Sequence, residues 1–336
     1  MLAANIHIRA DLPVLASDPY LCGMHVVLID RYLDSMIEGL GQLGLTYRYV
    51  PDCTGTEATL ALADAEVLVL RSKLALTADQ LRQAPRLRLV IRTGAGLDHL
   101  DLPALAAAGI RVVPTLGANS DAVGEHALGL LLGLLHHIPR SDAEVRRGQW
   151  LRQANMGEEL GGKVVGIVGY GHTGRAFARR LAGLGVRVLA YDRDQADYAD
   201  AYADAAPLAA LQAQCQVLSL HIPLDPANHH WLDARRLAGF AQPLWLINTS
   251  RGPVVDTQAL LSALASGRVL GAALDVLENE KLDRLTAVQQ RQMQALQAHP
   301  SVILTPHIAG WSWQAEQRFV DQTLGIVRRY LAGEEI

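Results

Sequence analysis

The chain has 336 residues, of which half are hydrophobic and 19% charged, and its net charge is −4 at pH 7. These values predict a folded globular protein of about two domains and give no reason to expect nucleic acid or an anionic membrane as a partner. The most apolar stretch, residues 127–135, is far shorter than the ~20 residues of a membrane span, so it predicts a buried helix.

The three cysteines, Cys22, Cys53 and Cys215, are odd in number and contain no CxxC pair. This spacing argues against a disulfide framework and against a zinc site, and it fits a reducing cytoplasm. Residues 1–23 have neither a basic start nor an uninterrupted apolar core, so we expect an N-terminal appendage or a start-site artefact rather than a signal peptide.

The first third of the chain alternates short apolar runs with helical patterns. Strands are predicted at residues 25–30, 46–50, 67–70, 89–91 and 111–113, with helices at 33–43 and near 78–84 and 103–108. This alternation predicts a parallel sheet covered on both faces, which binds ligands at the carboxyl ends of its strands.

Two of these strand ends carry cations. Arg71, Ser72 and Lys73 follow one strand, and Arg92 leads into a glycine-rich loop at Gly94, Ala95 and Gly96. The loop can offer backbone N–H groups to a carboxylate, and the arginines can bind a second anion such as phosphate. Alternatively, Arg71 and Lys73 are solvated loop residues, and the sequence leaves this choice open.

The middle of the chain changes to a helical period. Residues 119–136 predict a helix, capped by Asn119 or Ser120, that opens the second domain, and the polar stretch 149–162 predicts a loop. Residues 164–192 then predict a strand, a glycine turn, a helix, a second strand and an acid, the order that a dinucleotide site requires.

Each glycine of this turn has an expected structural role. Gly169 permits the tight turn, Gly171 lets the backbone approach a pyrophosphate, and Gly174 lets helix and strand pack closely. The helix that follows presents free N–H groups to the phosphates.

Asp192 ends this unit, where its carboxylate can accept hydrogen bonds from the adenosine ribose. The same charge would repel a 2′-phosphate, so NAD is favoured over NADP. The nearby Arg187 and Arg193 weaken this preference slightly, unless both are solvated surface residues.

Four further strands are predicted at residues 217–220, 244–248, 271–274 and 302–304, with helices at 258–266 and 314–331. His221 and Pro223 follow the first of these strands and are expected to line the cofactor site. Arg251, Glu280 and His307 follow the later strand ends, where a parallel sheet presents its ligand site.

These three residue types suit hydride transfer between a 2-hydroxy acid and NAD. An arginine can hold the substrate carboxylate and polarise the carbonyl oxygen, a histidine can accept the hydroxyl proton, and a carboxylate can orient that histidine. In a chain with 12 histidines, His307 can instead be structural, and Glu278, Glu280 and Lys281 can be a surface charge cluster.

The order of these motifs resembles the D-isomer-specific 2-hydroxyacid dehydrogenase family over nearly all of residues 24–331. The motifs are RSK, RTGAGLDHLD, GANSDAVGEHALGLLL, VGIVGYGHTG, NTSRGPVVD, GAALDVLENE and TPHIAGW. The resemblance implies two Rossmann- or flavodoxin-like, doubly wound domains with the active site in the interdomain cleft, and a homodimer. It places the substrate domain at residues 1–117 plus 311–336 and the NAD domain at 118–310.

The resemblance also implies roles for individual residues. Arg251, Glu280 and His307 would be the catalytic set. The NAD site would be lined by His172, Thr173, Asp192, Thr249, Ser250, Arg251, Asp275, His307, Ile308, Ala309 and Gly310, with Asp275 near the nicotinamide carboxamide.

Within the family, the chain is most similar to short bacterial 3-phosphoglycerate dehydrogenases, because a phosphorylated substrate would explain Arg71 and Arg92. It departs from the family pattern at Leu277 and Lys281, where many members have an aromatic residue and a proline. The sequence therefore predicts oxidation of 3-phosphoglycerate, the entry to serine synthesis. The alternatives are the same chemistry on glyoxylate, hydroxypyruvate or another 2-hydroxy acid, and an NAD-sensing, corepressor-like binding protein.

Overall fold

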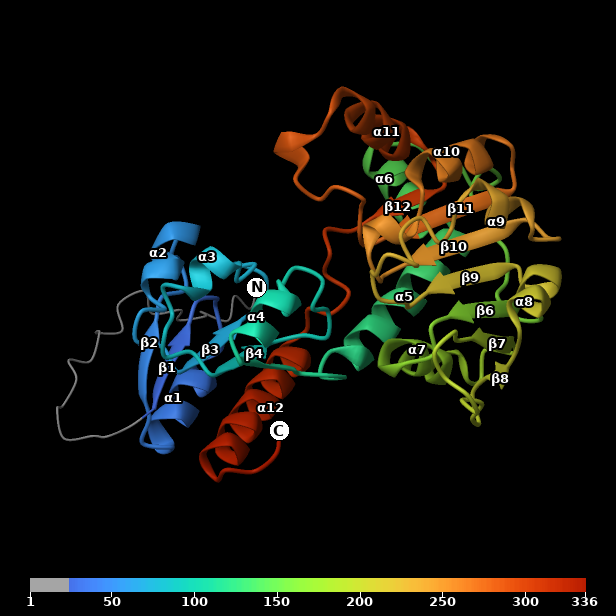
Figure 1. The fold of residues 1–336 in the computed structure, drawn as a ribbon. Helices are drawn as coiled ribbons and strands as arrows, with labels where there is room; N and C mark the ends of the chain where they lie inside the picture. Colours follow the sequence, from blue (N-terminus) through green and yellow to red (C-terminus); the bar gives the residue numbers. More distant parts are fainter. Residues whose placement is uncertain (1–23) are drawn as a thin grey trace. The chain divides into compact units, whose positions relative to one another are not determined.

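The computed structural model describes residues 24–336, which divide into two compact units (Figure 1). Unit 1 ends at Asn119 and takes up the chain again at Ser312–Ile336, and unit 2 spans Ser120–Trp311. The predicted boundaries lay at residues 117 and 311, so they differ from the observed ones by one or two residues. The predicted appendage, residues 1–23, and with it Cys22, lies outside the described residues.

Unit 1 contains a five-stranded parallel sheet in the order β2-β1-β3-β4-β5. Its strands are β1 (His25–Leu28), β2 (Thr46–Tyr49), β3 (Val67–Leu70), β4 (Leu89–Arg92) and β5 (Arg111–Pro114). Its helices are α1 (Asp34–Gln42), α2 (Gly55–Leu60), α3 (Ala78–Leu81), α4 (Leu102–Ala107) and α12 (Trp313–Leu331). The strand order reverses direction between β1 and β3, the point at which such sheets bind ligands.

Both faces of this sheet are covered, as its continuous apolar strands predict (Figure 1). Helices α2, α3 and α4 pack on one face, and α1 and α12 pack on the other. Gly39 lets α1 and α12 approach closely, since an added Cβ would lie 2.2 Å from Cδ1 of Leu324. The last helix is thus part of unit 1 although the whole of unit 2 precedes it in the chain.

Unit 2 contains a seven-stranded parallel sheet in the order β12-β11-β10-β9-β6-β7-β8. Its strands are β6 (Val164–Val168), β7 (Arg187–Tyr191), β8 (Asp204–Ala205), β9 (Val217–Leu220), β10 (Leu244–Asn248), β11 (Val269–Leu274) and β12 (Val302–Leu304). Its helices are α5 (Ser120–Leu135), α6 (Ile138–Arg146), α7 (His172–Leu181), α8 (Leu208–Gln214), α9 (Ala234–Ala238), α10 (Thr257–Ala265) and α11 (Ala287–Ala298). The strand order reverses between β6 and β9.

Two apolar cores hold this second sheet. Leu131 and Leu134 of α5 join Phe177 and Leu181 of α7 on one face, and the other core includes leucines of α8 to α11. Gly124 of α5 lies against α7, since an added Cβ would be 2.8 Å from the carbonyl carbon of Ala176. The apolar stretch at 127–135 is therefore a buried helix, as predicted. The predicted fold class, two doubly wound parallel α/β domains, is confirmed.

Five helices were not predicted, namely α2, α6, α8, α9 and α11. They are short or mainly polar, so they give little hydrophobic periodicity. Two of them have a capping box that is visible in the sequence, Thr54 with Glu57 before α2 and Thr286 with Gln289 before α11. For these two helices, the capping residues were thus the overlooked signal.

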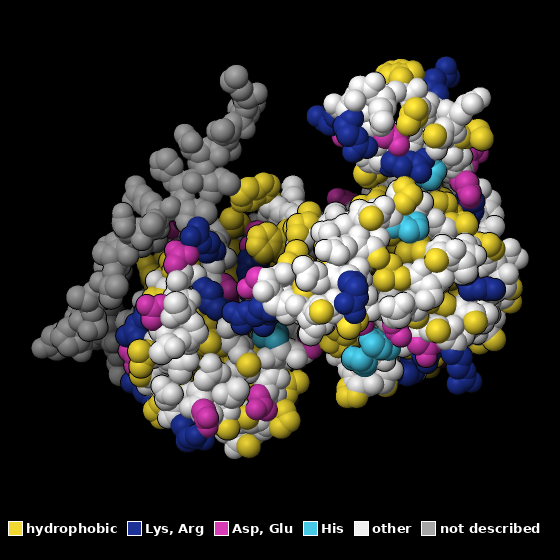
Figure 2. Space-filling model, turned by 90° about the horizontal axis from the view of Figure 1, so that it is seen from above, with side chains coloured by type: hydrophobic (Ala, Val, Ile, Leu, Met, Phe, Trp, Pro, Cys, Tyr) yellow, Lys and Arg dark blue, Asp and Glu magenta, His cyan; other side chains and the backbone are white. Residues whose placement is uncertain are grey.

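Within residues 24–336, no helix has the length and apolar character needed to cross a membrane. On the face drawn in Figure 2, cationic and anionic side chains are interspersed rather than gathered by sign. Cys53 and Cys215 are free thiols, and burial raises the pKa of Cys215 to about 12. Cys215 is therefore a neutral core residue.

Candidate active site

The glycine turn after β6 has the geometry of a close approach between backbones. Gly169 has a φ of +90°, and a Cβ there would lie 2.6 Å from the carbonyl oxygen of His221 at the end of β9. A Cβ on Gly174 would lie 2.1 Å from the carbonyl oxygen of Gly169, whereas one on Gly171 would have no atom within 4 Å. Two of the glycines thus permit packing within the chain, and the third faces open space.

Asp192, at the end of β7, fixes this turn. Its Oδ2 accepts hydrogen bonds from the backbone N–H of Tyr170 (2.7 Å) and from Nε2 of Gln195 (2.8 Å), and its Oδ1 accepts one from the N–H of Asp194 (2.9 Å). Each carboxylate oxygen has room for more than one donor, so these bonds leave the predicted contact with a ribose available.

A cavity of about 220 Å³ lies at the β6/β9 reversal of the sheet. It brings together five predicted cofactor residues, Gly169, Gly171, Asp192, His221 and Pro223. Arg193, which the sequence placed near the ribose, also lines the cavity, and the lining residues that the sequence did not indicate include Tyr191, Asn228 and Trp231. The last two come from the segment after β9, for which no local motif gave a signal.

Arg193 is held by acids of its own unit. Its guanidinium donates to Asp194 (3.0 Å) and to Asp225 (3.0 Å), and Nη1 also donates to Oδ1 of Asn228 (3.3 Å). Hydrogen bonds to Asp194 and Asp225 raise the pKa of Arg193. Two carboxylates therefore oppose the charge of Arg193, and Arg187, the other arginine near this site in sequence, donates to Asp204 (3.1 Å).

His221 lies beside the glycine turn as a neutral ring. Its Nε2 is 2.8 Å from Oγ of Ser219, and its ring centroid is 5.6 Å from that of Phe177. Removal from water lowers the pKa of His221 to about 3. The imidazole therefore contributes packing and hydrogen bonding without charge.

The other predicted residues follow β10, β11 and β12, which are neighbours in the sheet. Thr249, Ser250 and Arg251 follow β10, Asp275 follows β11, and His307 follows β12. A Cβ on Gly252 would lie 1.9 Å from the carbonyl carbon of Leu277, so the loop with Arg251 packs against the loop that leads to Glu280. Because parallel strands end at one edge, the three loops emerge together.

Asp275 organises the loop that carries His307. It is only 1% exposed, and its carboxylate accepts hydrogen bonds from the N–H groups of Ile308 and Ala309 (both 2.9 Å) and from Oγ1 of Thr305 (2.6 Å). Its carbonyl oxygen accepts the N–H of His307 (2.8 Å). These bonds hold His307 at a φ of +56°, which is unusual for a residue with a side chain. The predicted role of Asp275 beside the nicotinamide stays a prediction.

His307 and Glu280 lie together, with Nδ1 of the imidazole 3.0 Å from Oε2 of the carboxylate. Their side chains are 47% and 45% exposed, so the pair borders solvent. When Nδ1 carries the proton, the bond to Glu280 leaves Nε2 as a proton acceptor. The structure thus contains a carboxylate-oriented imidazole.

The loop around Glu280 has supports that the sequence did not reveal. His230, from the segment after β9, pairs with Glu278, and Oδ1 of Asn279 accepts the N–H of Lys281 (3.0 Å). Asn279 also donates to Gln289 of α11 (3.2 Å). These contacts hold the backbone of the loop between Leu277 and Lys281, the two positions at which the chain departs from the family pattern.

The residues of unit 2 fit a dinucleotide. Gly171 leaves open space at the start of α7, Asp192 lines the cavity, and the buried Oγ1 of Thr249 has no hydrogen-bond partner among the described residues. His172 is exposed and Thr173 is half-buried at the first turn of α7, while Ser250 is buried and donates to Asn248 (2.8 Å). An unpartnered hydroxyl next to Arg251 is an available donor for a bound cofactor.

At the carboxyl edge of the sheet in unit 1, Arg71 is already engaged. Its Nη1 donates to Oε1 of Glu316 in α12 (2.9 Å), and Nη2 donates to the other oxygen of the same carboxylate. Burial would lower the pKa of Arg71, but the hydrogen bonds and the charge of Glu316 raise it overall. Ser72 is exposed, and Lys73 donates to the carbonyl of Pro51. The contact of Arg71 with a phosphate therefore stays a prediction. The bond between Arg71 and Glu316 argues against it.

Some donors of the glycine-rich loop after β4 also already have hydrogen-bond acceptors within the unit. The N–H of Gly94 donates to Oγ1 of Thr115 (2.7 Å), and Nη1 of Arg92 donates to the carbonyl of Thr93 (3.1 Å). Ala95 is exposed and Gly96 half-buried. Within this loop, Ala95 and Gly96 rather than Gly94 are thus the candidates to meet a carboxylate.

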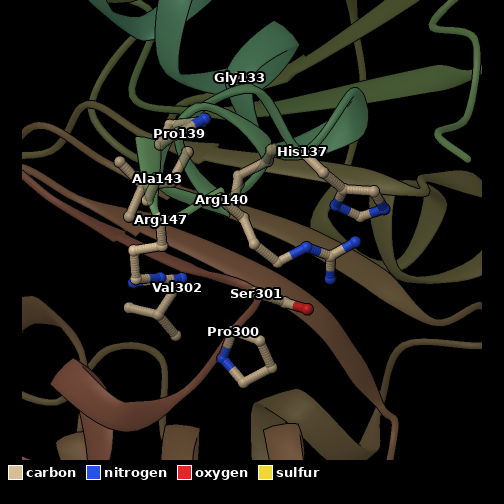
Figure 3. Close-up of a pocket in the computed structure, with 11 residues that line it drawn as sticks. Gly133, His137, Pro139, Arg140, Ala143, Arg147, Pro300, Ser301 and Val302 are labelled. Atoms are coloured by element: carbon tan, nitrogen blue, oxygen red, sulfur yellow. The ribbon is translucent and has the colours of Figure 1, made fainter. Parts of the chain in front are cut away.

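A second cavity, of about 250 Å³, lies between α5, α6 and β12. Figure 3 shows the side chains of Arg140 and Arg147 across from Pro300, Ser301 and Val302. None of the predicted site residues lines this cavity. It is therefore separate from the dinucleotide and His307 sites.

Comparison with known proteins agrees with this geometry. Residues 128–309 match the family model described as D-isomer specific 2-hydroxyacid dehydrogenase, NAD binding domain. A hydroxypyruvate reductase from Thermotoga maritima is 33% identical over 76% of this chain and 82% of that protein. A D-3-phosphoglycerate dehydrogenase from Mycobacterium bovis is also 33% identical, over 92% of this chain and 57% of that protein.

Among solved structures, the chain is similar to a D-lactate dehydrogenase from Aquifex aeolicus complexed with NAD and lactic acid. The two share 26% identity and superpose with a TM-score of 0.80 over 92% of this chain and 96% of the other.

Proposed function

Since the chain belongs to the D-isomer-specific 2-hydroxyacid dehydrogenase family, we propose that it transfers a hydride between NAD and C2 of a small D-2-hydroxy acid. The observation that carries this proposal is the His307–Glu280 pair at the ends of the late strands. NAD supplies the hydride acceptor in the oxidation direction.

The residues of this chain then have distinct tasks. Nε2 of His307 takes the proton of the C2 hydroxyl as the hydride leaves C2, and Glu280 stabilises the resulting imidazolium. Arg251 holds the substrate carboxylate with its planar guanidinium.

NAD rather than NADP fits the dinucleotide site. Asp192 would meet the ribose hydroxyls, and Arg193 already donates to Asp194 and Asp225. An added 2′-phosphate would face three carboxylates and one arginine, which disfavours it electrostatically.

Two substrate classes fit the family. The sequence favours 3-phosphoglycerate, with Arg71, Ser72 and Arg92 at neighbouring strand ends, and a phosphoglycerate dehydrogenase matches over 92% of the chain. Unphosphorylated acids such as hydroxypyruvate or glyoxylate are favoured by the engagement of Arg71 with Glu316.

Steady-state rates with NADH test the proposal. The panel is hydroxypyruvate, glyoxylate, pyruvate and phosphohydroxypyruvate, each followed by NADH absorbance, with NADPH as the cofactor control. Turnover of at least one acid is expected, and no turnover of any of them, in either direction, would contradict the assignment.

We also propose that the protein is a homodimer that associates through the surface of α6 and the following loop. Trp150 is 77% exposed and Met156 81%, and Ile138, Val145 and Leu151 are exposed nearby. Such a concentration of large apolar side chains is typical of an interface. Light scattering should give twice the chain mass, and Trp150→Asp should lower that mass, whereas the exposed Leu60→Asp in α2 should not.

A further inference from the structure

The ion pair of Arg71 and Glu316 occupies the place in unit 1 where a parallel sheet receives its ligand. Arg71 follows β3 directly, and its backbone N–H donates to Oδ2 of Asp30 beyond β1 (2.7 Å). The pair thus lies at the β1/β3 reversal of strand order, outside the carboxyl ends of the strands.

This ion pair differs from an ordinary surface pair in geometry and burial. Both carboxylate oxygens of Glu316 accept from the guanidinium, and the two side chains are only 15% and 16% exposed. The guanidinium carbon lies 5.3 Å from the ring centroid of Tyr32 and 5.6 Å from that of Phe319. A forked and packed pair of this kind holds a fixed orientation and is poorly screened by solvent.

The bond geometry determines what Arg71 can still bind. Glu316 accepts from Nη1 and Nη2, and Nε of Arg71 is buried, so a phosphate would have to displace Glu316 from the two nitrogens that it already accepts from. It would also bring two negative charges beside a carboxylate that the packed rings hold in place. The neighbouring Tyr32, whose hydroxyl lies 3.2 Å from Oγ1 of Thr93, adds no charge, because burial raises its pKa.

We propose that Glu316 is a specificity-determining residue that neutralises Arg71 and excludes a phosphate at this edge. The substrate is then an unphosphorylated 2-hydroxy acid. This inference rests on the proposed function, since it concerns which acid the same site accepts.

The test compares the parent protein with Glu316→Gln, which keeps the side chain's shape and removes its charge. The measured quantity is kcat/KM for phosphohydroxypyruvate divided by that for hydroxypyruvate, with NADH. The ratio should be below one in the parent and should rise about 10- to 100-fold in the variant, the range of a hydrogen bond to a charged group. The change should appear in KM for the phosphorylated acid, with kcat nearly kept.

Asp321→Asn is the matched control, because it removes one negative charge from the exposed side of the same helix, where Asp321 accepts from Gln317 (3.0 Å). The ratio should then change less than about twofold, since exposed charges are screened. Glu316→Asp should keep a low ratio, because it keeps the charge. A shift in Glu316→Gln no larger than in Asp321→Asn, or a parent that prefers the phosphorylated acid, overturns the inference.

Should Glu316→Gln fail to fold, Glu316→Ala takes its place, because it removes the same charge with a smaller side chain. The same ratio should then rise about tenfold or more. A shift no larger than that of Asp321→Asn again overturns the inference. If the parent reduces none of the acids, the proposed function fails and this inference with it, whereas turnover with an unchanged ratio overturns the inference alone.

Discussion

The charged residues at the carboxyl edges of the two sheets differ in the groups to which they bond. In unit 2, the buried Asp275 and the cavity-lining Asp192 accept backbone N–H groups of nearby loops, and these bonds shape the loops around His307 and the glycine turn. In unit 1, Arg71 is engaged by a carboxylate of α12, 245 residues away in the chain.

Charged side chains therefore have two different roles at a ligand-binding edge. In unit 2 the carboxylates of Asp192 and Asp275 hold the backbone of the site in place by accepting its N–H groups, and Glu280 orients His307. In unit 1 a cation that could have bound a ligand is neutralised before any ligand arrives. Substitutions of the same kind in the two units test whether this difference is real.

The largest expected effect is on turnover. His307→Ala should lower kcat by about two to four orders of magnitude, because it removes the proposed proton acceptor. The dissociation constant for NADH, measured by fluorescence, should stay within about threefold of the parent. His136→Ala, at an exposed position after α5, is the control and should leave both values unchanged. Near-parental turnover in His307→Ala would show that the proton goes elsewhere.

The next effect is on stability, and it compares an acid from each edge. Asp275→Asn should lower the free energy of unfolding by about 2–4 kcal/mol, because an amide offers one acceptor oxygen to three donors in a buried site. Asp30→Asn, which loses part of one bond to the N–H of Arg71 at a half-exposed position, should cost about 1 kcal/mol. Urea unfolding measures both. Equal costs would contradict the view that the acid of unit 2 contributes more to its loop than the acid of unit 1 does.

The same contrast explains how much was predictable from the sequence. The strands at 67–70, 217–220, 244–248 and 302–304 were predicted to the residue, because short and mainly apolar runs leave little choice. The glycine turn with Asp192, and the pairing of His307 with Glu280, lie within recognisable motifs. The partners of Arg71, Arg193 and Glu278 come from distant segments, and nothing in the local sequence indicates which acid or histidine folding will bring to them.

Smaller effects are expected from alanine substitutions at three glycines, which should differ in their effects on stability and on NADH binding. Gly174→Ala should lower the free energy of unfolding by about 1–3 kcal/mol, since its Cβ would meet the rigid carbonyl of Gly169 at 2.1 Å. Gly39→Ala in unit 1 should cost less, because its Cβ would meet the end of the flexible Leu324 side chain. Gly171→Ala should leave unfolding nearly unchanged and weaken NADH binding about tenfold or more, because the space it fills is the proposed phosphate position. Unchanged NADH affinity in Gly171→Ala would remove this glycine from the cofactor site.

The smallest effect is on the pH dependence of stability, and it compares a histidine of each unit. Burial lowers the pKa of His221 to about 3 and also lowers that of His25, where the charge of Asp64 partly offsets the burial. In both cases the unfolded chain binds the proton more readily, so stability is complete above the unfolded pKa near 6.5 and falls as the pH falls below it. His221 should contribute a slope of roughly 1 kcal/mol per pH unit between pH 6 and 4, and His25 a smaller one. Urea unfolding of His221→Gln from pH 7.5 to 4.5 should show a flatter profile than the parent, with His25→Gln in between. An unaltered slope in His221→Gln would mean that this imidazole binds a proton as readily in the folded protein as in the unfolded chain, and unit 2 would then hold an unneutralised cation beside its glycine turn at low pH.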